Sequence, residues 1–233
     1  MTRMKLIGNI TFPSPFKALR SFIAHAPFPM PISAQHIKSA IQHLRKSDPV
    51  MKQIIKDVGP FTHKLSRNKF DMLVNSILSQ QISVAAANTI RDRLRKLANE
   101  QVFTAETLVE FTVDQLREAG VSRQKASYIL DLSGKACEGI INFRGFAKKE
   151  NEGIIAELTL VKGIGRWTAQ MFLMFAMGRL DVFPVDDLGI QNAMKKNYNL
   201  PDEVTKSELH KIATIWQPYE TVASWYCWQS LDV

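Results

Sequence analysis

One stretch decides the fold of this chain, and it reads Leu158-Thr-Leu-Val-Lys-Gly163-Ile164-Gly165-Arg166-Trp167-Thr168-Ala169. It predicts the end of one helix, a turn in which two glycines flank a single apolar residue, and the start of a second helix. Gly163 and Gly165 permit positive φ and close backbone approach, and Ile164 can fill the space beneath the turn. The stretch therefore predicts two helices joined by a tight hairpin.

The hairpin has two interpretations. Backbone N–H groups at the start of the second helix point outward, where they can bind a phosphate oxygen. Such a contact reads no base sequence, so it suits a protein that scans DNA. The alternative is a helix–helix turn that binds no ligand. The residues of the hairpin leave both interpretations open.

The rest of the chain is also helical in pattern, and no strand–turn–helix segment or G-x-G-x-x-G motif accompanies it. We therefore expect a mainly α fold, with the two ends of the helical array packed together to give two lobes and a cleft between them. The predicted helices cover residues 34–45, 50–57, 69–78, 84–97, 105–111, 113–119, 123–136, 151–158, 166–177, 188–195, 206–215 and 219–228.

Length and composition narrow the classes of protein. The 233 residues are 45% hydrophobic, which is enough for a sizeable core. The formal net charge of +8 favours polyanionic partners, among which nucleic acid is the commonest large one, although charge alone does not decide this. No apolar run reaches the roughly 18 residues of a membrane span.

Cys137 and Cys227 are the only cysteines, and no C-x-x-C spacing is present. They cannot build a zinc site or an iron–sulfur cluster by themselves, so we expect two reduced, buried thiols in a reducing compartment. Residues 1–31 form an N-terminal extension whose first 30 residues lack Asp and Glu. An organellar transit peptide, a basic arm and a start site placed too early all fit this extension, and we assign it no role.

A pair of aspartates follows the hairpin helix, within Val182-Phe-Pro-Val-Asp186-Asp187-Leu-Gly-Ile190. Aspartate is a preferred N-cap, so capping alone could explain either residue or both. The functional alternative is an ionised carboxylate that faces a cleft, where the helix dipole favours its charged form. Such a carboxylate can stabilise an oxocarbenium-like sugar or orient an attacking water, as glycoside cleavage requires.

Together these motifs resemble the helix-hairpin-helix glycosylase superfamily of DNA repair enzymes, and within it 3-methyladenine DNA glycosylase II and its yeast-type relatives. Two further segments are similar to that family, and the resemblance runs from about residue 32 to 228. We therefore expect residues 32–233 to form one glycosylase domain of two lobes. The further segments are Ile77-Leu-Ser-Gln-Gln-Ile-Ser83 and the region from Trp216-Gln-Pro-Tyr219 to Trp228.

The resemblance implies a role for each matching position. The catalytic aspartate falls on Asp187, with Asp186 as its structural neighbour, and the wedge that fills the gap left by a flipped nucleotide falls on Gln81. Without the resemblance, Gln81 is simply a polar residue between two helices. The backbone that holds DNA phosphate falls on the hairpin, with Arg166 beside it: Gly163, Ile164 and Gly165.

The expected base pocket is formed by Trp228, Trp167 and Met171, while Trp216 and Trp225 are expected in the core. Electron-rich indoles attract a cationic base. Trp167 stands where strand-cleaving relatives carry a catalytic lysine, so we expect no lyase activity. Met171 replaces a tyrosine of the bacterial enzyme, which leaves the lesion spectrum open. Glu220 replaces a usual arginine, which puts a structural or DNA contact in doubt.

The expected function is therefore a monofunctional DNA glycosylase that removes alkylated purines, of the 3-methyladenine and 7-methylguanine type, flipped from double-stranded DNA in base excision repair. The alternatives are a non-catalytic binder of distorted or damaged DNA and a glycosylase for deaminated or etheno purines. We expect no cofactor and no iron–sulfur cluster, although the resemblance allows a monovalent cation at the hairpin backbone. We expect a monomer without a membrane partner, inside the cell: in the cytoplasm of a prokaryote or the nucleus of a eukaryote.

Overall fold

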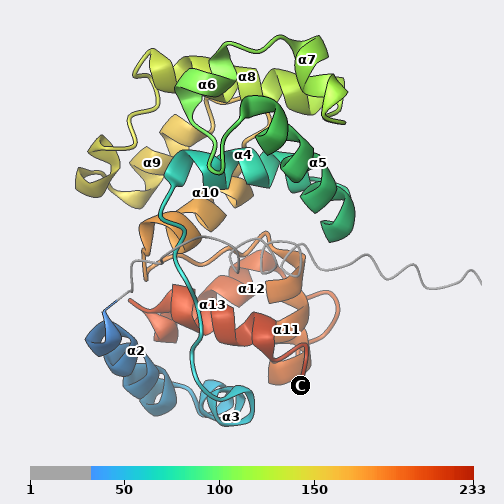
Figure 1. The fold of residues 1–233 in the computed structure, drawn as a ribbon. Coiled ribbons are helices and arrows are strands. Elements are labelled where there is room, and N and C mark those ends of the chain that lie inside the picture. The colour runs from blue at the N-terminus through green and yellow to red at the C-terminus, as the bar shows by residue number, and fades with distance from the viewer. Residues whose placement is uncertain (1–32) are drawn as a thin grey trace, which may run out of the picture.

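The computed structural model describes residues 33–233, and the regular structure within this range is entirely helical (Figure 1). The expectation of a mainly α fold is confirmed. The elements are α2 (Ala34–Ser47), α3 (Pro49–Val58), α4 (Lys69–Ser79), α5 (Val84–Ala98), α6 (Ala105–Val109), α7 (Val113–Glu118), α8 (Arg123–Cys137), η1 (Gly145–Lys148), α9 (Asn151–Leu158), α10 (Arg166–Phe172), η2 (Leu173–Met177), α11 (Leu188–Tyr198), α12 (Lys206–Ala213), η3 (Thr214–Trp216) and α13 (Glu220–Gln229).

The helices form two groups, which Figure 1 shows one above the other. The central group contains α4 to α10. The terminal group contains α2 and α3 from the start of the described chain and α11 to α13 from its end, and α13 contacts both α2 and α3. The expected packing of the two ends is therefore present. The segments 59–68 and 178–187 connect the two groups.

Local sequence sets most helix starts. Side chains at the N-cap accept hydrogen bonds from the backbone of the first helical turn, which satisfies N–H groups that the helix itself leaves unpaired. Thr112 and Thr205 belong to complete capping boxes with Gln115 and Glu208. Other caps are supplied by Ser33, Asp48, Asn68, Ser83, Thr104, Ser122 and Asp187.

The predicted helix 166–177 differs from the structure in its second half. The α-helix ends at Phe172 and continues as a π-helical turn, Leu173–Met177, that stops at Gly178 in the left-handed region. Residues 168–176 are buried on every side. Because this segment has no polar face, the spacing of its apolar residues could not indicate the wider π-helical turn. The short 3-10 helix Gly145–Lys148 was not predicted either.

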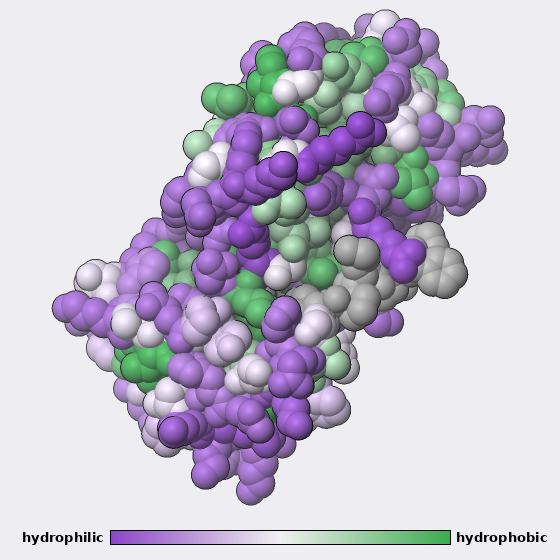
Figure 2. All heavy atoms as spheres, turned by 90° about the vertical axis from the view of Figure 1, so that its left-hand side faces the viewer, coloured by the Kyte–Doolittle hydropathy of each residue, from purple (hydrophilic) through white to green (hydrophobic). Residues whose placement is uncertain are grey.

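The core contains large aromatic side chains from both groups. Trp216, Trp228, Tyr226 and Phe172 are almost fully buried. On the face drawn in Figure 2, hydrophilic side chains cover most of both groups, and the apolar patches between them are small. Among residues 33–233, no helix combines the length and apolar character needed to cross a membrane.

One prediction about the cysteines is wrong. Cys227 is buried in α13 as expected, but Cys137 is exposed at the last position of α8. Its neighbours from Glu138 to Ile140 are exposed too, because the chain leaves the core where the helix ends. Residues 1–31, the expected extension, lie outside the described range, so its boundary stays a prediction.

Candidate active site

The Asp187 carboxylate is fixed by three N–H groups. As the N-cap of α11, it accepts a hydrogen bond through Oδ1 from the backbone N–H of Ile190, at 2.9 Å. The same oxygen accepts from Trp228 Nε1 at 2.8 Å, and Oδ2 accepts from Trp167 Nε1 at 2.8 Å. N–H donors at these distances stabilise the negative charge of a carboxylate. Asp187 therefore caps α11 and also holds its carboxylate in a fixed position.

The two indoles come from different groups of helices. Trp228 belongs to α13 in the terminal group, whereas Trp167 belongs to the first turn of α10 in the central group. Asp187 precedes α11, so its bond to Trp167 crosses between the groups. The carboxylate therefore lies where the groups meet. Trp167 stands two residues beyond Gly165, which also connects the site to the hairpin turn.

Burial limits access to this carboxylate. Asp187 is only 4% exposed, whereas Trp167 is partly exposed. An external group can therefore reach Oδ2 only after the Trp167 indole or the neighbouring backbone moves. Asp187 is nevertheless well placed for chemistry, because a carboxylate in a water-poor site stabilises a nearby cation more strongly than one in bulk water does.

Asp186 has a different environment. Its side chain is exposed and pairs with Lys206 of α12, with Nζ 2.6 Å from Oδ1. The structure thus separates the two aspartates: Asp187 caps α11 and binds the indoles, and Asp186 forms a surface ion pair. The interpretation in which both residues serve as caps is wrong.

Gly189 belongs to this site, although no sequence motif predicted a role for it. A Cβ at this position would lie 2.9 Å from Asp187 Oδ1 and 3.0 Å from Trp228 Cδ1. The first distance is shorter than real Cβ contacts and the second is at their lower limit, so the missing side chain leaves room for the bond between carboxylate and indole. The available signal was a glycine in the first turn of a helix, where glycine costs stability unless packing requires it.

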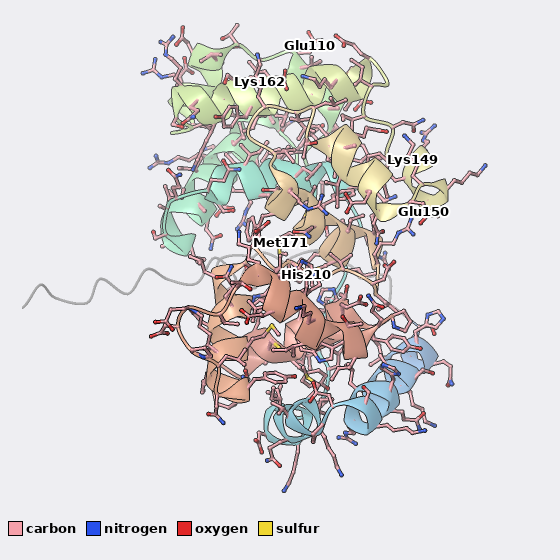
Figure 3. The ribbon with its side chains drawn as sticks, turned by 180° about the vertical axis from the view of Figure 1, so that it is seen from behind. Glu110, Lys149, Glu150, Lys162, Met171 and His210 are labelled. Atoms are coloured by element: carbon pink, nitrogen blue, oxygen red, sulfur yellow. The ribbon has the colours of Figure 1, made fainter. Side chains whose placement is uncertain are left out.

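Of the expected base-pocket residues, Trp228 and Trp167 donate hydrogen bonds to the carboxylate, and Met171 lies on α10 with Trp167. Trp228 is 2% exposed and stacks on Phe175, with ring centroids 6.0 Å apart. Met171 follows Trp167 by one turn on α10 and is 1% exposed, and Figure 3 places it near the level where the groups meet. Trp216 and Trp225 are buried, which confirms their expected place in the core.

The hairpin has the predicted geometry. Gly163 has φ of +79°, and a Cβ there would lie 2.1 Å from Tyr128 Cδ2, so only glycine fits. Ile164 is 3% exposed and fills the core beneath the turn. Gly165 is the N-cap of α10 and offers no side chain, so no side chain among residues 33–233 caps the first N–H groups of that helix. These donors are therefore available to an external acceptor.

Arg166 and Gln81 are both on the surface. The Arg166 guanidinium pairs with Glu152 of α9, with NH2 2.5 Å from Oε1. The side-chain hydrogen bond to Glu152 raises the pKa of Arg166 above its usual value. Gln81 is exposed in the loop between α4 and α5, and its φ of +55° lies in the left-handed region.

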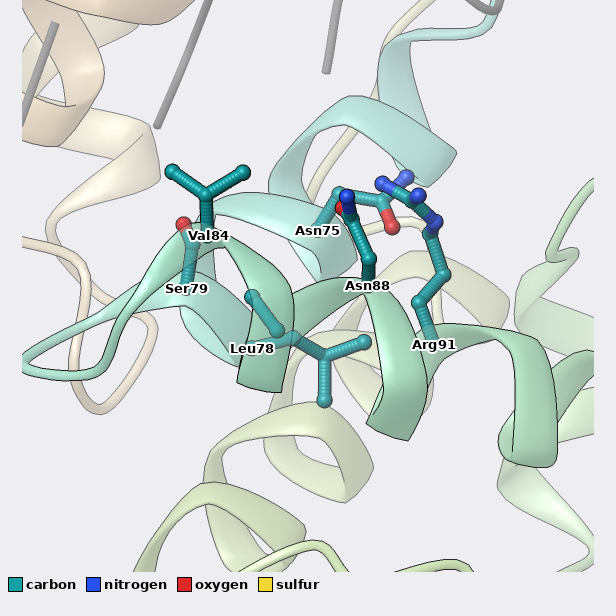
Figure 4. Close-up of a pocket in the computed structure, with 7 residues that line it drawn as sticks. Asn75, Leu78, Ser79, Val84, Asn88 and Arg91 are labelled. Carbon is teal, nitrogen blue, oxygen red and sulfur yellow. The ribbon is translucent and has the colours of Figure 1, made fainter. Parts of the chain in front are cut away.

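A small pocket lies between α4 and α5, next to the loop that carries Gln81 (Figure 4). Asn75 is 2% exposed there; its Nδ2 donates to Asp71 at 2.7 Å, and its Oδ1 has no hydrogen-bond partner among the described residues. The lining residues are Asn75, Leu78, Ser79, Val84, Ala87, Asn88 and Arg91.

Glu220, expected from the resemblance to stand in place of an arginine, lies in the first turn of α13. It is 8% exposed, and burial raises the pKa of its carboxyl, with a further contribution from the negative charge of Asp181. One carboxyl oxygen, Oε2, has no hydrogen-bond partner among residues 33–233. Glu220 is therefore a buried acid of the terminal group.

Comparison with known proteins identifies the relatives of this chain. The family described as "HhH-GPD superfamily base excision DNA repair protein" matches residues 74–218. DNA-3-methyladenine glycosylase 1 of Schizosaccharomyces pombe is 34% identical over 193 residues, which covers 81% of this chain and 85% of the relative.

Solved structures of DNA-3-methyladenine glycosylases and glycosidases are similar to this chain as well. The crystal structure of a DNA-3-methyladenine glycosidase from Bacillus halodurans is 36% identical and superposes with a TM-score of 0.77, covering 82% of this chain and 88% of that one. The S. pombe 3-methyladenine DNA glycosylase in complex with abasic DNA is 32% identical, with a TM-score of 0.74 and coverage of 84% and 97%. The hairpin and the Pro184–Asp187 segment lie inside the matched family region.

Proposed function

Because the chain belongs to the HhH-GPD superfamily of base excision DNA repair proteins, we propose that it is a monofunctional DNA glycosylase. Its substrates are alkylated purines, of the 3-methyladenine and 7-methylguanine type, flipped out of double-stranded DNA. The observation that carries the assignment of the reacting group is the Asp187 carboxylate, held by three N–H donors where the two groups of helices meet.

The chemistry follows from the charge of the substrate. An alkylated purine already carries positive charge, so it leaves C1′ without a strong general acid. The base leaves as a neutral purine with the electron pair of the glycosidic bond, and the sugar develops oxocarbenium character, which a carboxylate on the face opposite the base stabilises. The same carboxylate orients the water that adds to C1′ and takes up the proton that this water loses. We propose that the entering nucleotide displaces the Trp167 indole from Oδ2, while the bonds from Ile190 and Trp228 keep Oδ1 in place.

Strand cleavage requires a different residue at position 167. A lyase forms a Schiff base between a lysine amine and C1′, and an indole has no such nucleophile. Trp167 donates its N–H to Asp187 instead. The product is therefore an intact strand with an abasic site, which is nicked only by later alkaline treatment or by another enzyme.

The remaining surface residues are proposed to hold the DNA. The backbone at Gly163, Ile164 and Gly165 binds a phosphate oxygen, since α10 lacks a side-chain cap there. Arg166 exchanges its ion pair with Glu152 for a DNA phosphate beside this turn. Gln81 enters the gap that the flipped nucleotide leaves, because it is exposed at a loop tip. Trp167 contacts the cationic base. Contact with Trp228 and Met171, which are 2% and 1% exposed, requires the Trp167 indole to be displaced first.

The same assignment leads to proposals about bound ions, oligomeric state and cellular location. The hairpin offers backbone oxygens, which suit a hard monovalent cation; the carbonyl groups of Val161 and Gly163 each accept one hydrogen bond and keep a second lone pair. Cys137 and Cys227 are too few to hold an iron–sulfur cluster. We propose a monomer that acts where the DNA is: in the cytoplasm of a prokaryote or the nucleus of a eukaryote.

The test compares Asp187→Asn with Asp186→Asn on methylated duplex DNA. Asparagine still caps a helix, so the first variant should fold, but it lacks the negative charge. We expect release of 3-methyladenine to fall by about 100-fold or more, with binding to a duplex containing an abasic-site analogue preserved. Asp186→Asn removes only the exposed pair with Lys206 and should keep wild-type rates.

Different results would select other functions. Release of hypoxanthine or ethenoadenine in preference to methylated purines would assign the alternative lesion class to the same site. Binding of distorted duplexes with no release of any lesion by the wild-type protein would replace the enzyme with a non-catalytic binder. Substantial release of methylated purines by Asp187→Asn would refute the role of this carboxylate.

A further inference from the structure

The loop that carries Gln81 is attached to the hairpin by its neighbour. Gln80 ends α4, and its Nε2 donates a hydrogen bond to the carbonyl oxygen of Gly163, at 2.9 Å. Two segments that lie 83 residues apart in the sequence are thereby joined at their tips. Gln80 is partly buried and bonds to the hairpin, whereas Gln81 is exposed to solvent.

Helix α8 supports both partners of this bond. Lys125 Nζ donates to the carbonyl oxygen of Leu78 at 2.7 Å, which binds the last turn of α4 to α8. One turn further on, the Tyr128 ring lies against the Cα of Gly163 so closely that no side chain fits there. The end of α4 and the hairpin turn therefore contact the same face of α8, and Gln80 joins them directly.

On its α5 side, the loop has less support. Ser79 and Val84, at the two ends of the loop, line the small pocket between α4 and α5 (Figure 4). Gln81 itself has a left-handed backbone, with φ of +55°, which a glutamine adopts only when its surroundings impose it. The residue that precedes Gln81 is the one bonded to the hairpin, through the Gln80 side chain.

We propose that Gln80 is a positioning residue for nucleotide flipping. It holds the wedge loop (residues 80–83) at a fixed separation from the phosphate-binding turn (residues 163–165). Gln81 then enters the duplex at the nucleotide whose backbone the turn holds, and no ordering of the loop is needed at that moment. The inference rests on the proposed function, and it adds a residue that touches neither the base nor the sugar.

Stability alone does not explain the contact. Every residue of α4 from Phe70 to Leu78 is buried, so the helix is fixed without Gln80. A purely structural role therefore predicts that Gln80→Ala changes neither flipping nor base release. A positioning role predicts that both fall while the unfolding temperature stays within a few degrees of the wild-type value.

A double-mutant cycle with Gln81 distinguishes these roles. In single-turnover release of 3-methyladenine, we expect Gln80→Ala to slow the wild-type enzyme by about tenfold, the scale of one misplaced contact. In a Gln81→Ala background the same change should cost less than about twofold, because no wedge remains to be positioned. Equal losses in the two backgrounds, or no loss in either, would overturn the proposal.

Flipping is measured separately from chemistry. In the Asp187→Asn background, 2-aminopurine placed beside the lesion reports the unstacked state by fluorescence, and Gln80→Ala should lower that signal. An unchanged signal would contradict the positioning role. The proposed function fails in another way, through absence of release by the wild-type protein on every lesion, so the two failures are distinguishable.

Discussion

At the residue scale, Asp187 combines a local role with a distant one. Its capping role follows from its place after Pro184-Val-Asp, and family resemblance suggested the catalytic one. The two indole donors could not be predicted from these residues, since Trp167 and Trp228 are 20 and 41 positions away. The cap restrains Oδ1, so the group that starts the helix is also held still for chemistry.

Gly189→Ala tests how tightly that carboxylate is held. The added methyl group would press on Asp187 Oδ1 and the Trp228 ring, which a Cβ would approach to 2.9 and 3.0 Å. We expect a loss of about tenfold or more in the rate of base release, since small displacements of a reacting group are costly. The rate is measured in single turnover, at saturating enzyme.

Gly153→Ala is the matched control for that substitution. Gly153 is exposed in α9, and a Cβ added there would have nothing within 4 Å. Alanine should raise the free energy of unfolding by up to about 1 kcal/mol, because it loses less backbone entropy than glycine on forming a helical turn. Its rate of base release should equal that of the wild type; similar losses in both variants would mean that Gly189 has no special relation to the site.

Two substitutions of Gln81 separate its backbone strain from its proposed role as the wedge. Its φ of +55° is unfavourable for any residue with a Cβ. Gln81→Gly should therefore exceed Gln81→Ala in stability by about 1 kcal/mol in denaturant titrations, although both remove the wedge. Base release should fall equally in the two variants. A less stable glycine variant would show that the left-handed conformation carries no strain.

At the element scale, the helices were largely predictable because caps and apolar stripes agree. Asn151–Leu158 has the predicted bounds, and α2 and α5 differ from prediction only near their ends. The π-helical turn after Phe172 was not predictable, because its residues are buried all round. The bond between Gln80 and Gly163 was also beyond sequence reasoning, since it depends on how two distant elements pack.

Asp48 shows how one side chain joins several elements. It caps α3 through the N–H groups of Val50 and Met51, and its Oδ2 accepts from Trp216 Nε1 at 2.8 Å and from the Tyr198 hydroxyl. It is 1% exposed, so each donor would lack a partner if the carboxylate were removed. The cap thereby connects the start of α3 with α11 and η3.

Asp48→Ala should consequently destabilise the terminal group. Loss of the cap and two unpaired buried donors should lower the free energy of unfolding by about 3 kcal/mol or more. Asp57→Ala, on the exposed part of α3, removes a carboxylate that accepts from Gln53 and from no other side chain in the described part of the chain, and it should change the free energy by about 0.5 kcal/mol or less. Chemical denaturation measures both, and equal values would show that Asp48 is not a structural junction.

At the scale of the whole molecule, the segment 59–68 holds the two groups together. His63 lies against Phe175 of the central group, with ring centroids 4.8 Å apart, and its Nε2 is 3.3 Å from the carbonyl oxygen of Met174. Phe61 packs on Trp225 of the terminal group at 4.7 Å. The packing of the chain ends was predictable in outline, but this aromatic bridge was not, because its partners lie more than 100 residues away.

The bridge predicts a pH-dependent stability. Burial lowers the pKa of His63 to about 4 in the folded protein, from 6.5. Between these values the unfolded chain binds more protons, so stability is complete above pH 6.5 and declines as the pH falls toward 4. The loss from this group should be about 1–3 kcal/mol.

In urea titrations, His63→Gln should flatten the dependence of stability on pH between pH 6.5 and 4, because glutamine keeps an N–H donor but does not titrate. His36→Gln, on the exposed face of α2, is the control for losing a histidine. A slope retained in full by His63→Gln would assign the acid sensitivity to other groups and leave the bridge without a role in it.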